Sequence, residues 1–189
     1  MTHFTVLYDA CVLYPAPLRD LLMQLALTDL YRAKWTNRIH EEWIRNVLKN
    51  RPDISRNILE KTRDLMNFHS LDSLVEQFED IEASLQLPDA NDNHVLAAAI
   101  VSNSDVILTF NLKDFPASEL DKYGIEAQHP DDFLMHLTDL DFDLFCDALK
   151  ETRGRLRNPP KTIEQYLETL LNQGLSKTVS FLLKHQMKL

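Results

Sequence analysis

The sequence predicts an α/β fold with a mostly parallel central sheet flanked by helices, followed by a helical C-terminal appendage. Two short apolar runs, residues 4–8 and 106–109, stop abruptly at polar residues and have the composition of buried strands. Segments with apolar residues at helical spacing separate these strands, and strands that alternate with helices favour a parallel sheet. After Pro130 only helical patterns remain.

The first 70 residues alternate between short apolar runs typical of strands and segments with apolar residues at helical spacing. Pro15 and Pro17 end the segment after the first strand, and leucines then recur at helical spacing. Thr36 fits the N-cap of a later helix, which Pro52 ends. The elements expected here are a strand at 4–8, a helix at 18–26, a strand at 31–35, a helix from Thr36 through Val47 and a helix at 55–67.

The next 60 residues complete the predicted sheet. From Asp72 to Asp92 there are seven acids and no Lys or Arg, which is typical of a solvated loop and helix face. Asp92 then opens an alanine-rich segment that is apolar enough for a buried helix. The expected elements are a strand at 74–75, a helix at 94–101, a strand at 106–109 and a last strand at 125–127.

The C-terminal part has a different character. Helices are expected at 132–149, 162–171 and 177–188, with a basic, proline-terminated connection at 153–161. We therefore expect an α/β domain at residues 1–137 and a helical extension at residues 138–189.

Composition excludes several classes of protein. The 189 residues include 20 Lys and Arg against 29 Asp and Glu, a net charge of −9, which argues against a broad basic surface for nucleic acid without excluding local patches. The three glycines lie 20 or 30 residues apart, so no glycine-rich loop can cradle a phosphate. No window approaches the roughly 18 apolar residues of a membrane span, and we expect a cytoplasmic protein. Cys11 and Cys146 fit neither a disulfide framework nor a cysteine zinc site.

Acidic side chains stand where predicted strands end. In a parallel sheet, functional groups collect at the carboxyl ends of the strands, and four acids are expected to converge there: Asp9, Glu42, Asp92 and Asp114. Each acid has a structural alternative. Asp92 could be a helix N-cap, Asp114 could cap the following turn, and Glu41 and Glu42 could lie on an exposed helix face. Asp9 is different, because an acid that directly follows a buried strand needs a partner. Converging carboxylates repel each other unless a cation is present, and Mg²⁺ or Mn²⁺ prefers oxygen ligands.

Four segments together resemble the successive motifs of PIN-domain nucleases. They are VLYDACVL at 6–13, EEW at 41–43, DNHVLAAA at 92–99 and TFNLKDFP at 109–116. The resemblance covers about residues 3 to 136, and the last two motifs in tandem are its specific part. The chain is most similar to the VapC-type toxin ribonucleases of bacterial toxin–antitoxin pairs, in a branch with a longer helical C-terminus.

The resemblance implies roles for individual residues. The family's metal-binding acids, which hold Mg²⁺ or Mn²⁺, fall on Asp9, Glu42, Asp92 and Asp114, with Thr109 and Asn111 as supporting polar groups. Glu42 is preferred to Glu41 because it lies six residues after Thr36, as the family spacing requires. Cys11 stands where the family often has Asn, a difference that bears on a supporting hydrogen bond and not on a metal ligand. Asp89 could act as an outer acid.

The implied activity is metal-dependent hydrolysis of RNA phosphodiesters by an endoribonuclease. Basic residues should guide RNA to the acids, and the candidates are Lys34, Arg38, Arg45, Lys49 and Lys113. The five basic residues between Lys150 and Lys161 could be a second RNA path or a solvated linker. The resemblance further implies a homodimer and inhibition by a small antitoxin protein.

Other functions meet specific obstacles. A haloacid-dehalogenase-like phosphatase needs a second Asp where Cys11 stands, and a gluzincin needs His where Ile44 stands. A catalytically silent PIN domain that binds RNA or protein remains the alternative. The complete set of four acids argues against it, because a scaffold has no use for them.

Overall fold

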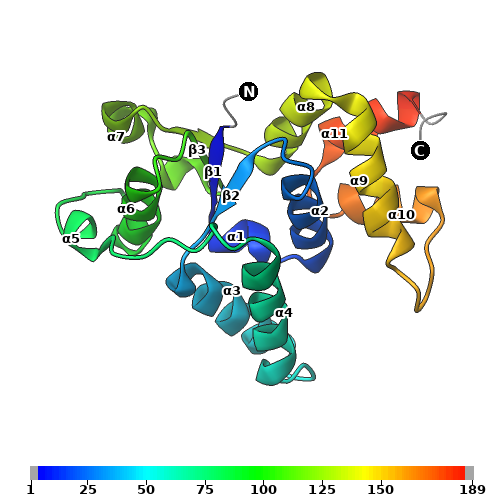
Figure 1. Cartoon of the computed structure of the whole chain (residues 1–189), viewed down its shortest axis with the longest axis horizontal. Coiled ribbons are helices and arrows are strands. Elements are labelled where there is room, and N and C mark those ends of the chain that lie inside the picture. Colours follow the sequence, from blue (N-terminus) through cyan, green and yellow to red (C-terminus); the bar gives the residue numbers. More distant parts are fainter. Residues whose placement is uncertain (1–3, 186–189) are drawn as a thin grey trace.

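Within residues 4–185, which the structure describes, a sheet of four parallel strands forms the centre of this computed structural model (Figure 1). The strands are β1 (Thr5–Tyr8), β2 (Arg32–Lys34), β3 (Val106–Leu108) and β4 (Glu126–Gln128), in the order β2-β1-β3-β4. The predicted α/β class with a parallel sheet is confirmed. The strand expected at 74–75 is reduced to a single bridge between Leu74 and Trp35.

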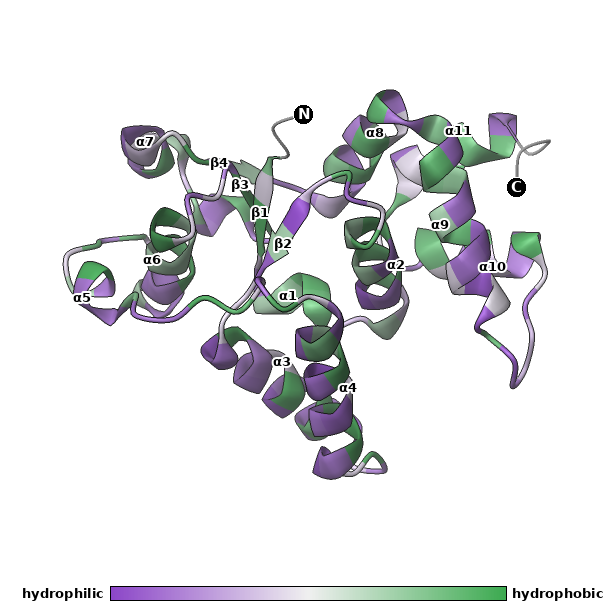
Figure 2. Ribbon diagram, viewed as in Figure 1, coloured by the Kyte–Doolittle hydropathy of each residue, from purple (hydrophilic) through white to green (hydrophobic). Residues whose placement is uncertain are grey.

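Helices cover the sheet and extend beyond it. Those up to β4 are α1 (Ala10–Leu13), α2 (Ala16–Ala26), α3 (Asn37–Asn50), α4 (Arg56–His69), α5 (Glu79–Glu82), α6 (Asn93–Val101) and α7 (Ala117–Leu120), with short 3₁₀ turns η1 (Ala90–Asp92), η2 (Leu112–Asp114) and η3 (Asp121–Tyr123). In Figure 1 helices α5, α6 and α7 lie on one side of the sheet, and α2 lies on the other. Helix α6 is apolar around most of its circumference, as Figure 2 shows, because the core buries it from Val95 to Ala99.

The C-terminal helices are α8 (Pro130–Leu140), α9 (Phe142–Gly154), α10 (Ile163–Leu171) and α11 (Ser176–Lys184). The single helix predicted at 132–149 is wrong, because Asp141 divides it. The backbone of Asp141 is extended, and its carboxylate accepts a hydrogen bond from the amide of Leu144 and so caps α9. The predicted end of the last helix at residue 188 lies outside the described residues.

One hydrophobic core joins the sheet to the C-terminal helices. Phe145 and Leu149 of α9, Leu167 of α10 and Leu182 of α11 belong to the same buried cluster as the strand residues. Helix α9 packs against α2, and α8 runs without a break across the expected boundary at 137/138. No helix in the described part of the chain is long and apolar enough to cross a membrane.

A buried carboxylate ties α8 to the start of α11. The Asp131 side chain is 3% exposed and accepts hydrogen bonds from the amide of Lys177 at 2.8 Å, the amide of Thr178 at 2.9 Å and the Thr178 hydroxyl at 2.8 Å. Leu175, at the N-cap position of α11, supplies no side-chain cap. Asp131 therefore performs this capping from another helix.

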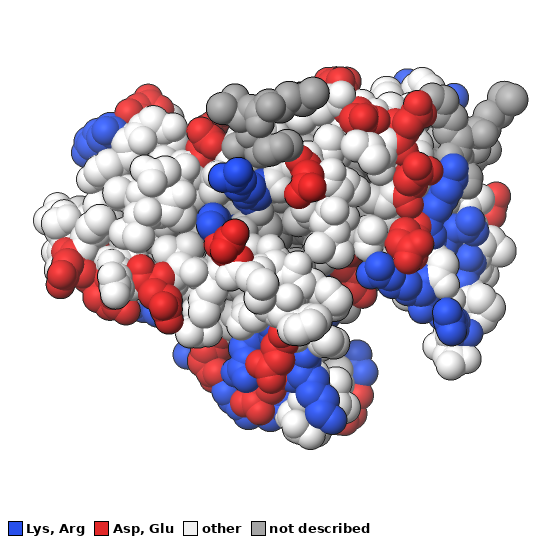
Figure 3. Space-filling view, viewed as in Figure 1, with Lys and Arg blue, Asp and Glu red and all other residues white. Residues whose placement is uncertain are grey.

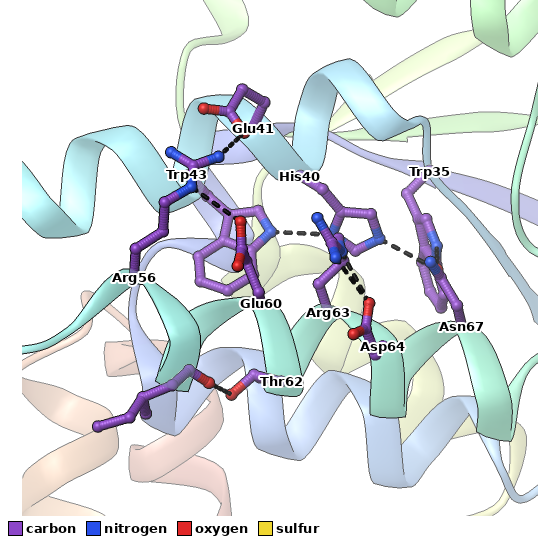
Figure 4. A network of polar contacts seen from close by, with 11 residues as sticks. Trp35, His40, Glu41, Trp43, Arg56, Glu60, Thr62, Arg63, Asp64 and Asn67 are labelled. Atoms are coloured by element: carbon purple, nitrogen blue, oxygen red, sulfur yellow. Dashed lines mark hydrogen bonds and ion pairs between the residues drawn. The ribbon is translucent and has the colours of Figure 1, made fainter.

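Helices α3 and α4 are held together by a polar network (Figure 4). Nε1 of Trp43 donates to Nδ1 of His40 at 3.0 Å, so the imidazole proton lies on Nε2, which is 3.2 Å from Oδ1 of Asn67. The same Asn67 oxygen accepts from Nε1 of Trp35 at 2.8 Å. At the other end of the network, Arg56 of α4 pairs with Glu41 of α3. These contacts fix the orientation of α3, the helix that carries Glu42.

Asp131→Ala is expected to lower the free energy of unfolding by about 3 kcal/mol, because it leaves buried donors at the start of α11 without their charged acceptor. The neighbouring Asp132 is the matched control. Its side chain is 46% exposed and pairs only with the Lys177 ammonium, so Asp132→Ala should cost less than about 1 kcal/mol. Urea unfolding of both variants tests this, and equal losses would contradict the capping role.

His40 should make stability depend on pH. Burial lowers its pKa to about 4, although the Asn67 hydrogen bond opposes this shift. Between pH about 4 and about 6.5 the unfolded chain binds a proton at His40 that the folded chain does not. The free energy of unfolding should therefore fall as the pH falls through this range. In His40→Gln this pH dependence should be smaller than in wild type, whereas the exposed His69→Gln should retain it. Urea unfolding at several pH values distinguishes them, and parallel curves for wild type and His40→Gln would contradict the prediction.

Candidate active site

The ends of β1 and β3 bring Asp9 and Thr109 together. Tyr8 pairs with Leu108 in the sheet, so the next residue of each strand emerges at the same edge. The amide of Asp9 donates to the Leu108 carbonyl at 3.1 Å, and the Thr109 hydroxyl donates to Oδ2 of Asp9 at 2.7 Å. Asp9 is only 6% exposed. The partner that a buried carboxylate requires is therefore present in the next strand.

Cys11 supplies a second donor to the same carboxylate. Its thiol lies 3.0 Å from Oδ2 of Asp9, and its sulfur accepts from the amide of Phe110 at 3.3 Å. Burial and the negative charge of Asp9 raise the pKa of Cys11, so the thiol keeps its proton and can donate. The supporting hydrogen bond on which the family's Asn bears is therefore made here by Cys11, whose sulfur bridges Asp9 and the loop after β3.

Asp92 stands at the N-cap position of α6, but its carboxylate makes no capping hydrogen bond. Its pKa is raised to about 6, first by partial burial and then by the negative charges of Asp9, Asp89 and Asp114, while His94 acts in the opposite direction. Two other predicted acids, Asp9 and Asp114, therefore lie within electrostatic range of Asp92. The field around Asp92 favours a proton or a cation over a bare carboxylate.

The other two acids near Asp92 differ in how they are held. Asp114 ends the turn η2, and Pro116, not Asp114, occupies the N-cap position of α7. Asp89 accepts from the amide of Asn91 at 2.9 Å and so caps η1. Asp89 thus has a structural role, whereas the contacts of the described residues give none to Asp114.

Glu42 reaches the same region through His94. Oε1 of Glu42 lies 3.0 Å from Nε2 of His94 and 3.7 Å from Nε of Arg38, one turn earlier on α3. The His94 contact is an ion-pair distance without the alignment of a hydrogen bond. Because His94 is 1% exposed and also influences Asp92, it stands between Glu42 and the other acids.

His94 was not among the site residues predicted from the sequence, in which it begins an apolar helix. A signal was available, since Asp92, Asn93 and His94 are consecutive polar residues at the start of an otherwise apolar segment. Asn93 also has a defined task. Its side chain accepts from the amide of Leu87 and donates to the carbonyl of Leu85, both at 3.0 Å, which holds the loop that leads into α6.

The remaining predicted residues differ in their contacts. The amide of Asn111 donates to the Thr109 hydroxyl at 3.0 Å, while its side chain is exposed. Lys34 donates to the carbonyl of Asp72. Arg38 is held by Glu82 at 2.8 Å in addition to Glu42. Arg38 is exposed as well, and the exposed candidates without an ion pair among the described residues are Arg45 and Lys49 on α3 and Lys113 beside Asp114.

The donor set suits a hard divalent cation. Carboxylate oxygens dominate it, and both burial and the negative charges of Asp9, Asp89 and Asp114 raise the pKa of Asp92. Among the described residues, however, no three His, Cys, Asp or Glu side chains are close enough to form a preassembled metal site. The acidic side chains are therefore of the type that binds such a cation. In this structure they lie farther apart than the ligands of one bound ion.

Comparisons with known proteins support this arrangement. Residues 5–113, more than half of the chain, match the PIN domain family, and residues 130–184 match the VapC50 C-terminal domain. A protein of Mycobacterium tuberculosis (strain ATCC 25618 / H37Rv) named "Putative ribonuclease VapC50" is 55% identical over 82 residues. That alignment covers 43% of this chain and 48% of the relative, so the chain spans about half the length of the curated relative it matches.

The first family match contains β1, β2 and β3 together with Asp9, Glu42 and Asp92, and it ends one residue before Asp114. The second begins at the first residue of α8, where the C-terminal helices begin. Because the first match covers more than half of the chain, the chain belongs to the PIN domain family.

Proposed function

We propose that this protein is a metal-dependent endoribonuclease that hydrolyses RNA phosphodiesters and acts as the toxin of a bacterial toxin–antitoxin pair. One observation carries the proposal: Asp9 and Asp114, from two other motifs, both act on Asp92, and their negative charges add to the burial that raises its pKa. The family match and the name of the relative support the same activity.

In this proposal Asp9, Glu42, Asp92 and Asp114 hold Mg²⁺ or Mn²⁺. The bound ion supplies an activated water for attack on phosphorus and stabilises negative charge on the leaving oxygen. Thr109 and Cys11 both donate to Oδ2 of Asp9 and so fix the orientation of its carboxylate.

The other residues of the site control charge and position. His94 lies between Glu42 and Asp92 and lowers the pKa of Asp92, so it offsets part of the repulsion among the acids. The network that joins α3 to α4 holds the backbone from which Glu42 extends.

RNA approaches along α3 in this proposal. Glu42, Arg45 and Lys49 lie three to four residues apart and therefore share one face of the helix. The exposed side chains of Arg45 and Lys49 can contact phosphates on the way to the acids, and Lys113 can do so from the opposite side. Arg38 must first leave Glu82 to take part.

The partners and location belong to the proposal as well. Resemblance to VapC-type toxins supports a small antitoxin, a homodimer and a cytoplasmic location. Asp92 argues against the alternative, a silent PIN domain that binds RNA or protein. Its carboxylate makes no capping hydrogen bond, and burial and nearby carboxylates raise its pKa, which costs stability without a benefit to a scaffold.

Cleavage of RNA should require both the metal and the acids. With Mg²⁺ or Mn²⁺ the wild type should cut single-stranded or structured RNA, and EDTA should abolish cutting. Asp9→Asn and Asp92→Asn should each lose more than about 100-fold, because a charge that holds the ion is removed. Thr109→Val, which removes only a donor to Asp9, should lose about 10- to 100-fold. The measurement is the rate of cleavage of a labelled RNA.

Asp121→Asn is the matched control for these changes. Asp121 lies in η3, shortly before β4 begins at the opposite edge of the sheet, so its neutralisation should leave the rate unchanged. Near wild-type turnover in both Asp9→Asn and Asp92→Asn would refute the metal-site assignment. A folded wild type that is inert toward RNA with every metal would favour the silent alternative.

Asp92 should destabilise the metal-free protein at neutral pH. Because its pKa is raised to about 6, the folded chain binds a proton there between pH about 4 and about 6 that the unfolded chain does not. In EDTA, Asp92→Asn should therefore gain stability relative to wild type at pH above about 6, and this gain should vanish as the pH falls to about 4. With Mg²⁺ or Mn²⁺ the order should reverse, since the wild type gains about 2.7 kcal/mol at 100 times the dissociation constant.

Thermal unfolding of wild type, Asp92→Asn and Asp92→Ala measures these differences. An N-cap role makes the opposite forecast, because loss of a cap in Asp92→Ala costs about 1 kcal/mol with or without metal. A loss of that size, together with no stabilisation of the wild type by metal, would leave Asp92 a structural cap.

A further inference from the structure

A basic hairpin links α9 to α10, far from the acids in the chain. We define it as residues 153–161, which contain Arg153, Arg155, Arg157 and Lys161, with Lys150 just before it. The sequence left open whether this segment is a solvated linker or a surface that binds RNA. Three features of the structure decide between these readings.

The first feature is that the hairpin is ordered. Arg157 and Pro160 form an antiparallel bridge across its tip. Leu156 packs against the hydrophobic core, and Thr162 begins α10 with a capping box that includes Gln165. A flexible linker would have neither anchor. The basic side chains therefore extend from a fixed backbone, which reduces the entropy lost on binding.

The second feature is that these cations lack close acidic partners. Elsewhere Arg38, Arg51, Arg56 and Arg63 each have a carboxylate oxygen within 2.8 Å. In and beside the hairpin the ion pairs are longer, at 3.4 Å from Arg155 to Glu151 and 3.8 Å from Lys150 to Asp147.

The remaining two arginines of the hairpin, Arg153 and Arg157, have no ion pair among the described residues. Figure 3 shows the resulting cluster of Lys and Arg over the C-terminal helices, beside a row of acidic side chains. Glu164 lies within electrostatic range of Arg153, and Asp20 within range of Arg155, but neither forms a close ion pair with these guanidinium groups. The cations therefore remain available to an anionic ligand.

The third feature is the chemistry of the cluster. Guanidinium groups form paired hydrogen bonds with phosphate oxygens. Residues 150–161 contain no aromatic side chain on which a base could stack, and Leu156 is the one large aliphatic residue and packs inward. Protein–protein interfaces usually depend on buried aromatic or aliphatic side chains, which this surface lacks. A phosphate backbone therefore fits the surface better than an acidic protein does.

We propose that the basic hairpin is a second RNA-binding surface, which contacts the phosphate backbone of single-stranded RNA outside the active site and without sequence preference. The identity of the polyanion as RNA rests on the proposed function. Figure 1 shows the hairpin and the α3–α4 pair extending on the side of the molecule to which the carboxyl ends of the strands point. RNA long enough to reach both surfaces binds more tightly than short RNA.

The test is a salt titration of RNA binding in EDTA, where no cleavage can occur. Fluorescence anisotropy follows wild type and Arg155→Gln/Arg157→Gln with labelled single strands of about 30 and about 6 nucleotides. With the long strand, the slope of log K against log salt should be smaller in the variant by about 1.4, or about 0.7 for each lost phosphate contact. With the short strand the difference should be much smaller, and changing the RNA sequence should leave the slopes unchanged.

Two further variants make the test specific. Arg32→Gln/Lys122→Gln removes the same charge from exposed positions outside the hairpin and should retain the wild-type slope. Arg155→Lys/Arg157→Lys keeps the positive charge and should retain most of the wild-type slope. Thermal unfolding checks that each variant is folded.

Three outcomes overturn the proposal. Equal changes in the Arg155/Arg157 and Arg32/Lys122 variants would mean that only net charge matters. An unchanged slope in the Arg155/Arg157 variant would show that the hairpin does not bind RNA. If this variant loses binding of polyglutamate but not of RNA, the partner of the hairpin would be an acidic protein. Failure of the proposed function looks different: wild type would not cleave RNA with Mg²⁺ or Mn²⁺, whatever the hairpin variants do to binding.

Discussion

A carboxylate at the end of a buried strand needs hydrogen-bond donors, and Asp9 obtains them from Thr109 and Cys11. These bonds also join the ends of β1 and β3, so the carboxyl edge of the sheet is held in one geometry. The other acids of the site are arranged around this fixed group. Cys11 shows that a thiol can take a position where the family often has an amide, provided that its pKa stays high enough to keep the proton.

The site accumulates negative charge that the fold does not neutralise. Asp9 is satisfied by donors, but Asp92 makes no cap and faces Asp9, Asp89 and Asp114. A group that costs stability in the isolated protein is typical of a functional position. The buried network of His40, Trp43 and Asn67 has the opposite character, because every polar atom in its contacts has a partner, and it stabilises the helix that presents Glu42.

The C-terminal helices share the core of the sheet and are not a loosely attached addition. Asp131 bonds α8 to α11, and α9 packs against α2. This packing places the 153–161 hairpin at a defined position with respect to the rest of the protein. A surface of unpaired cations can contribute to binding only if such anchors hold it, which links the stability of this region to its proposed role in RNA binding.

The sequence by itself determined the parallel α/β class and the candidate acids, because both depend on local patterns. The apolar runs before Asp9 and Thr109 and the alanine-rich helix after Asp92 are visible without a structure. Thr36 was also predictable as an N-cap, since capping involves only residues three apart. The division of the 132–149 segment at Asp141 was not, because its apolar periodicity continues across the break.

Only the tertiary structure decided which polar residues meet. The contacts between Cys11 and Phe110, Glu42 and His94, and Asp131 and Thr178 join residues that lie 47 to 99 positions apart or on different helices. The raised pKa of Asp92 likewise depends on carboxylates from three motifs. Local periodicity carries no information on such pairs, because their separation in space is set by the packing of the whole core.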